Sequence, residues 1–179
     1  MPSTARPRQA ASETHPHRRR STPGAGREEL VDALLAASRA LVAVAARSLA
    51  DLAEDVTLPQ YRALVELAQR GPLRAADLAQ ALSVDRSTAT RMCERLVRKE
   101  LVDRRPESTD RRAVSLTLTP AGSELVAEVT RRRRAELAKI VRRMPREGRV
   151  QALAALRAFA DAAGEVPAQD WAMGWDLGS

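Results

Sequence analysis

The apolar positions along the first third of the chain recur mainly at helical spacing. Over residues 27–52 they return every three or four positions, and Glu28 lies in the first turn, where the helix dipole favours an acid. A second helix is predicted to follow Thr57, a typical N-cap residue, with Pro59 in its first turn. The Gly-Pro pair at 71–72 should lie past its end.

The pattern changes in the middle of the chain. Two short helices are expected over about residues 74–82 and 85–99. Leu101–Val102 and Val114–Leu118 then have the composition of strands, the second with alternating apolar residues. The polar stretch 104–112 between them predicts a β-hairpin with a charged tip.

Helical spacing returns in the last third. Thr119 is expected to cap a long helix that runs to about Arg143, because a proline follows it and proline is favoured just inside a helix. Pro145 should start a last helix that ends near Ala163. The remaining tail, residues 164–179, carries both tryptophans, which either dock on the body of the protein or on its dimer partner, or belong to a mobile end.

Charge is concentrated at the N-terminus. The net charge is +7, but residues 1–27 hold six arginines against one glutamate, which leaves 24 basic against 22 acidic residues elsewhere. Residues 1–26 are rich in Pro, Ser, Thr and Gly and lack apolar periodicity, so we expect a disordered basic arm. It could attract nucleic-acid phosphates, but a dispensable tail or a mis-called start site is at least as good an interpretation.

Several function classes have no residues to support them. No apolar run approaches the roughly 18 residues of a membrane span, so we expect a soluble protein with no membrane partner. The single cysteine, Cys93, fits a reducing, cytoplasmic compartment. Both histidines, His15 and His17, lie in the arm, so we predict no enzyme, no catalytic residue, no metal and no cofactor.

Residues 75–94 meet the requirements of a helix-turn-helix. Ala79 supplies the small residue where the two helices approach most closely, and Ser83 occupies the turn position that is commonly glycine. The inward positions are apolar, namely Leu78, Leu82, Val84, Ala89 and Met92. Cys93 also projects inward, which favours packing over a role as a redox sensor.

The opposite face of the second helix is suited to DNA. Hydroxyl and arginine side chains near a helix N-terminus fit base edges in the major groove, and arginines further along fit phosphates. The candidate DNA-binding residues on this helix are Arg86, Ser87, Thr88, Thr90, Arg91, Arg95 and Arg98. The alternative is an exposed helix that carries charge only for solubility.

The predicted hairpin favours DNA binding over a helix that is charged only for solubility. Four arginines, Arg104, Arg105, Arg111 and Arg112, cluster at its expected tip, where a narrow minor groove would attract an inserted arginine. Asp110 could hold Arg112 by an ion pair and so fix its direction. We therefore add Asp110, Arg111 and Arg112 to the candidate DNA-binding residues.

At this point the chain resembles the multiple-antibiotic-resistance regulator (MarR) family, over about residues 30–163. The resemblance is most specific over 75–122, which includes LAQALSVDRSTATRMCERLVRKELVDRRPESTDRRAVSLTLTPAG. The family's wing motif falls on Asp110 and Arg112. The resemblance implies a homodimer with interlocked terminal helices that reads a pseudo-palindrome, with repression often relieved by a small-molecule effector or by oxidation.

We therefore predict a mostly α fold with a small β-hairpin wing: a winged helix-turn-helix over about 57–118 between dimerisation helices at 27–52 and 120–163. A stripe on the long helix supports dimerisation independently, since it needs a partner surface: Leu125, Val129, Leu137, Ile140 and Met144.

The predicted function is a nucleoid-associated transcriptional regulator, expected to be a repressor, that binds double-stranded DNA. The alternatives are a winged-helix module that binds protein and a nonspecific DNA-coating protein.

Overall fold

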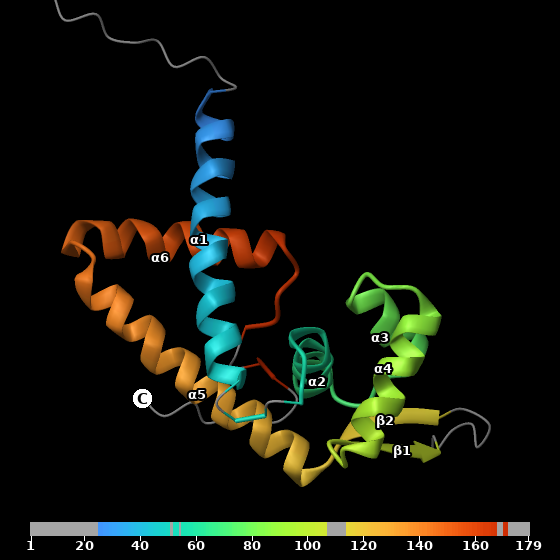
Figure 1. Ribbon diagram of the computed structural model, residues 1–179. Helices are drawn as coiled ribbons and strands as arrows, with labels where there is room; N and C mark the ends of the chain where they lie inside the picture. The colour runs from blue at the N-terminus through green and yellow to red at the C-terminus, as the bar shows by residue number, and fades with distance from the viewer. Residues whose placement is uncertain (1–24, 51, 54, 107–113, 168–169, 172–179) are drawn as a thin grey trace, which may run out of the picture. The chain divides into compact units, whose positions relative to one another are not determined.

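The computed structural model describes residues 25–50, 52–53, 55–106, 114–167 and 170–171. Two compact units are distinguished, up to Arg39 and from Ala40. The elements, labelled in Figure 1, are α1 (Ala25–Ala50), α2 (Leu58–Arg70), α3 (Ala75–Ala81), α4 (Arg86–Arg98), β1 (Val102–Pro106), β2 (Val114–Leu118), α5 (Pro120–Arg143) and α6 (Arg146–Ala162). The predicted mostly helical fold with a small hairpin is confirmed.

Helix α2 begins as its sequence predicts. The Thr57 hydroxyl oxygen accepts from the Gln60 backbone N–H at 3.4 Å, and the Gln60 side-chain oxygen accepts from the Thr57 N–H at 3.1 Å. This reciprocal capping box satisfies two backbone donors that the first turn would otherwise leave unpaired. The helix ends at Gly71, whose φ of 78° lies in the region that favours glycine.

The hairpin is longer than predicted. β1 and β2 pair antiparallel, with Arg104 opposite Leu116 and Arg105 opposite Ser115. Those two arginines therefore belong to a strand and not to the tip, because the cross-strand pairing extends the first strand to Pro106. Leu73 adds a third short segment to this sheet, since its N–H and C=O both bond to Leu116, at 3.2 and 2.8 Å.

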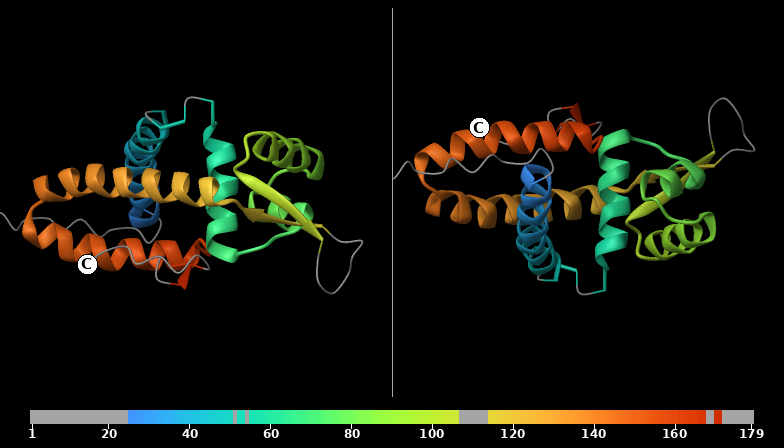
Figure 2. Two further views of the ribbon diagram at one scale, coloured as in Figure 1. Left: turned by 90° about the horizontal axis from the view of Figure 1, so that it is seen from below. Right: turned by 90° about the horizontal axis from the view of Figure 1, so that it is seen from above.

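The core of the second unit surrounds α2. Figures 1 and 2 show α2 between α5 on one side and the helix-turn-helix with its hairpin on the other. The main buried side chains are Leu64, Leu67, Leu78, Leu96, Val102, Leu116, Val126 and Val129. The core thus joins the base of α5 to the winged elements, and it is built from aliphatic residues as the scarcity of aromatics requires.

The predicted apolar stripe of α5 divides into two parts. Val129 is fully buried in the core, together with Val126, which the stripe prediction omitted. Ile140 and Val141, near the end of the helix, remain more than 40% exposed. Only the C-terminal part of α5 therefore offers an apolar surface to a partner.

Helix α6 is amphipathic without a buried residue. Val150, Leu153, Leu156 and Phe159 are all more than half exposed. The first unit, described by itself, is the N-terminal part of α1, and its Leu30, Val31 and Leu35 are also at least half exposed. Within its own unit, none of these apolar faces is covered by other described residues.

The chain ends were predicted only in part. α1 begins at Ala25, two residues earlier than expected. Trp171 packs against the core and its indole N–H donates to the Val166 carbonyl at 3.1 Å, so docking is the correct alternative for this residue. Trp175 and most of the predicted arm lie outside the described residues. None of the helices in the described ranges combines the length and apolar character that a bilayer crossing needs.

Candidate nucleic-acid interface

The helix-turn-helix has the predicted close packing. Leu78 and Ala79 of α3 and Ala89 and Met92 of α4 are buried. Ser83 in the turn adopts a φ of 54°, the left-handed conformation in which glycine is common. Serine therefore accepts a strained backbone at the turn that sets the angle between the two helices.

Asp85 organises the N-terminus of α4. Its Oδ1 accepts from the Ser87 hydroxyl at 2.6 Å and from the Thr88 backbone N–H at 2.8 Å. Its Oδ2 accepts from the Thr88 hydroxyl at 2.7 Å. These hydrogen bonds, led by that from the Ser87 hydroxyl, hold the pKa of the Asp85 carboxyl well below its usual range.

Sequence reasoning missed the role of Asp85. It was expected only as the first residue of the helix, although an aspartate directly before a run of hydroxyl residues is itself an N-cap signal. The structure shows a carboxylate that fixes two of the predicted DNA-binding side chains, Ser87 and Thr88.

The predicted residues of α4 lie on one side of the helix. Arg86, Ser87, Arg91, Arg95 and Arg98 are exposed, and Thr88 and Thr90 are half-buried. The opposite side is buried, with Ala89, Met92, Cys93 and Leu96 in the interior. The exposed side of α4 is thus a row of hydroxyls near the N-terminus followed by arginines.

Two further hydrogen bonds order this surface. The Thr90 hydroxyl donates to the Arg86 backbone carbonyl at 2.8 Å, one turn back. The Arg91 guanidinium donates from Nη2 to the Thr88 hydroxyl oxygen at 3.3 Å. The Arg91 side chain is therefore tied to the hydroxyl that Asp85 fixes.

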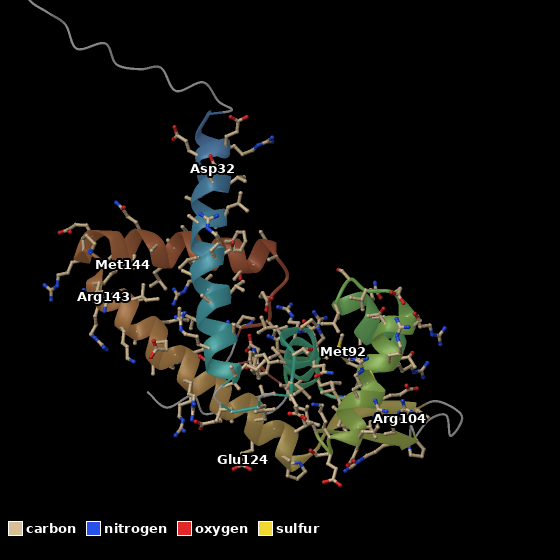
Figure 3. All side chains as sticks on the ribbon, in the orientation of Figure 1. Asp32, Met92, Arg104, Glu124, Arg143 and Met144 are labelled. Atoms are coloured by element: carbon tan, nitrogen blue, oxygen red, sulfur yellow. The ribbon has the colours of Figure 1, made fainter. Side chains whose placement is uncertain are left out.

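A groove of about 410 Å³ separates the exposed side of α4 from the start of α2. Arg91 and Arg95 line it on the α4 side, and Thr57, Pro59 and Gln60 line it on the α2 side. Met92, labelled in Figure 3, also lines this groove from α4. Two guanidinium groups thus lie beside the hydroxyl row, where they suit an anionic backbone.

The hairpin packs against the C-terminal half of the interface. β1 contacts α4, and the hairpin extends away from that helix (Figure 1). Arg104 and Arg105 are exposed on β1, and Arg105 lies 3.7 Å from the Asp103 carboxylate. Asp110, Arg111 and Arg112 lie outside the described residues, so the wing contact stays a prediction.

Cys93 lies inside the protein, as its helical position predicts. Its side chain is 1% exposed, and burial raises the pKa of its thiol. A thiol of raised pKa is a poor nucleophile, because the thiolate is the reactive form. The structure therefore favours the packing interpretation over a redox sensor.

A buried carboxylate on α2 escaped prediction. Glu66 is 1% exposed and bonds to Arg62 at 3.1 Å and to Arg70 at 2.9 Å. Arg62 also pairs with Glu165 of the C-terminal segment at 3.0 Å. The spacing of four residues between these charges is typical of a solvated helix face, so only the tertiary fold reveals that Glu66 is buried.

The interface contains no candidate metal site. No three His, Cys, Asp or Glu side chains gather into a metal-binding group anywhere in the described ranges. The chemistry of this surface is that of hydrogen-bond donors, acceptors and cations.

Comparison with known proteins supports the same reading of the fold. The model of the MarR family matches residues 56–114, which hold α2, the helix-turn-helix and β1. The HTH-type transcriptional repressor MdtR of Bacillus subtilis is 32% identical over 99 residues, which are 55% of this chain and 64% of MdtR. The match covers between about half and 64% of the length of such curated relatives.

Solved structures resemble more of the chain. RV1404 from Mycobacterium tuberculosis is 45% identical, with a TM-score of 0.75 over 79% of this chain and 96% of that protein. A mutant of MepR from S. aureus, bound to an oligodeoxyribonucleotide, is 25% identical, with a TM-score of 0.55 over 75% of this chain and 97% of its own. Because the chain has a helix-turn-helix with a hairpin, matches the family model and is similar to these relatives, it belongs to the MarR family.

Proposed function

We propose that this protein is a sequence-specific DNA-binding transcriptional regulator that represses its targets. The exposed side of α4 carries the proposal, because ordered hydroxyls and arginines occupy the positions from which a recognition helix reads the major groove. The similarity to a MepR mutant that is bound to an oligodeoxyribonucleotide supports DNA as the partner. The similarity to MdtR, a named repressor, supports the direction of regulation.

The regulator acts as a homodimer in this proposal. Three apolar faces are exposed: on the first turns of α1, on the end of α5 and along α6. Exposed apolar side chains of this number are a typical sign of a protein interface. A dimer with two-fold symmetry would place two copies of α4 on half-sites about one helical turn, roughly 10 bp, apart.

The wing is proposed to make the second contact. Arg112 would enter the minor groove next to the half-site, with Asp110 beside it and Arg111 near the phosphates. Arg95 and Arg98, further along α4, would bind phosphates and supply affinity that does not depend on sequence.

A small-molecule effector is also proposed, at a cavity of about 690 Å³ between α2 and α5. Its lining includes apolar side chains, three arginines and one acid, Glu165, so it favours a small apolar molecule with negative charge. Because α2 packs on the helix-turn-helix, a ligand there could change the position of α4. An Ala138→Trp variant, which fills this cavity, should lose any effect of an aromatic carboxylate such as benzoate on DNA binding and keep DNA binding itself.

The experiment that tests the function is selection of bound duplexes from a random DNA pool at near-physiological salt. The expected result is an enriched pseudo-palindrome. Arg91→Ala should weaken binding to it, whereas Arg142→Ala, which removes the same charge at the end of α5, should not. Absence of enrichment would favour the protein-binding module, and equal binding of all duplexes with a steep salt dependence would favour nonspecific coating.

A further inference from the structure

On the exposed side of α4, the partner of each hydroxyl group determines whether that hydroxyl donates or accepts a hydrogen bond. A serine or threonine hydroxyl has one proton to donate and two lone pairs that accept. Three such hydroxyls belong to the proposed interface, on Ser87, Thr88 and Thr90. The partner of each proton therefore decides what the hydroxyl can offer to DNA.

All three protons are used within the protein. Ser87 and Thr88 bond to the two oxygens of Asp85, at 2.6 and 2.7 Å. An ionised carboxylate only accepts, so each hydroxyl must be the donor, and the low pKa of Asp85 keeps the carboxylate ionised. Thr90 bonds to a backbone carbonyl at 2.8 Å, which also only accepts.

The remaining lone pairs define the surface that faces a duplex. Among the described residues nothing donates to the Ser87 or Thr90 hydroxyl, so each keeps both lone pairs. Thr88 keeps one lone pair, because the other accepts from Arg91. In the major groove, adenine N6 and cytosine N4 are donors, whereas guanine O6 and N7 and thymine O4 are acceptors. Hydroxyls that can only accept match the amino groups of adenine and cytosine and oppose the oxygens of guanine and thymine.

We propose that Asp85 is a positioning residue that sets the base preference of α4, by holding Ser87 and Thr88 as acceptors for adenine or cytosine amino groups. This inference rests on the proposed function, since it names the bases that the same surface reads. A hydroxyl bonded to a carboxylate does not readily turn its proton to a base, because a charge-assisted hydrogen bond is stronger than one between neutral groups. The arginines of α4 then supply the donors that guanine needs.

The decisive variant is Asp85→Asn, because its effect on each hydroxyl is fixed by the backbone. The Thr88 N–H can only donate, so the amide oxygen must take the place of Oδ1, which also keeps the Ser87 bond. The amide NH₂ then takes the place of Oδ2 and donates to the Thr88 hydroxyl. That hydroxyl becomes free to donate to DNA, while the helix keeps a cap, since asparagine is also a favoured N-cap residue.

The experiment compares the duplexes selected by four forms of the full chain: wild type, Asp85→Asn, Thr88→Val and Asp77→Asn. Thr88→Val keeps the shape but removes the hydroxyl, so the base at which it loses discrimination is the one that Thr88 reads. At that base the wild type should prefer adenine or cytosine. Asp85→Asn should shift the ratio toward guanine or thymine by about fivefold, which corresponds to one net hydrogen bond of about 1 kcal/mol.

Asp77→Asn controls for charge, because it removes an equal negative charge from an exposed position on α3 and should leave the base preference unchanged. If the wild type selects a site but Asp85→Asn keeps the same preference at the Thr88 base, the inference is wrong and the proposed function stands. The inference also fails alone if Thr88→Val loses no discrimination or if the wild-type base is guanine or thymine. If the wild type selects no site, both are overturned.

Discussion

A Cβ atom on Gly122 would lie 2.1 Å from the backbone carbonyl oxygen of Leu101. The two residues meet where the first turn of α5 packs against the segment between α4 and β1. The Thr119 hydroxyl joins the same contact, since it donates to the Glu100 carbonyl at 2.7 Å and accepts from the Gly122 N–H at 3.0 Å. A glycine is therefore needed for α5 to start this close to the wing.

Gly122→Ala should destabilise the protein by about 1 to 3 kcal/mol, because backbone atoms must move to admit the methyl group. Urea unfolding measures the change in the free energy of unfolding. Gly148→Ala on α6 is the matched control, since its new Cβ meets only the Pro145 ring at 4.0 Å. The control should stabilise by up to about 1 kcal/mol through helix propensity. Equal effects of the two substitutions would contradict the close approach.

Arg95→Ala should weaken DNA binding about equally for all sequences and lower the slope of log affinity against log salt by about one, as expected for one lost phosphate contact. Titrations at several salt concentrations, on the selected site and on a scrambled duplex, measure both quantities. A loss confined to the selected site would instead assign Arg95 to base reading.

Leu156→Asp should convert the proposed dimer to monomers, because it places a charge in the middle of the exposed apolar face of α6. Sedimentation velocity measures the oligomeric state. Gln151→Asp adds the same charge on the opposite side of α6 and should leave the dimer intact. A dimer that survives Leu156→Asp would show that α6 lies outside the interface.

Cys93 should react with iodoacetamide much more slowly in the native protein than in the urea-unfolded chain at pH 8, because it is buried and its pKa is raised. Mass spectrometry of alkylated protein over time measures the two rates. Hydrogen peroxide should accordingly leave DNA binding unchanged. Rapid native alkylation together with peroxide-sensitive binding would restore the redox-sensor alternative.

The stability advantage of wild type over Asp85→Asn should depend on pH. The pKa of Asp85 in the folded state lies below its ordinary value of 3.8, so the ionised group contributes stability above that value. This contribution should be lost as the pH falls from about 4 toward the lower pKa of the folded state. Urea unfolding of both forms between pH 6 and 2.5 measures the difference, and a gap that does not narrow would contradict the sign.

Local signals predicted most of the fold correctly. Thr57 and Thr119, each with a proline after it, mark helix starts because capping is a property of neighbouring residues. The inward face of α4 followed from helical period alone, including Cys93. These features depend on residues that are close together in the sequence, so they can be predicted from one sequence without knowledge of the tertiary contacts.

Features that depend on contacts distant in sequence were missed. Glu66 looks solvated in its i,i+4 pattern, and only packing of other elements on α2 buries it. Arg104 and Arg105 look like part of a charged hairpin tip in the sequence, and only their pairing with Leu116 and Ser115 of β2 places them in a strand. In the interface, the exposed residues of α4 can be predicted from the sequence. The orientation of the Ser87 and Thr88 hydroxyl protons cannot, because it depends on their hydrogen bonds to Asp85.

Helix α5 is one unbroken element of 24 residues, about 36 Å long. One end is locked to the wing through Gly122, and the other exposes Ile140 and Val141. Such a rigid helix acts as a lever. In a dimer joined at the C-terminal end of α5, a small change in the tilt of α5 at that end would produce a larger displacement of the wing at its N-terminal end. The distance between the two recognition helices of the dimer would then be set by residues that never touch DNA.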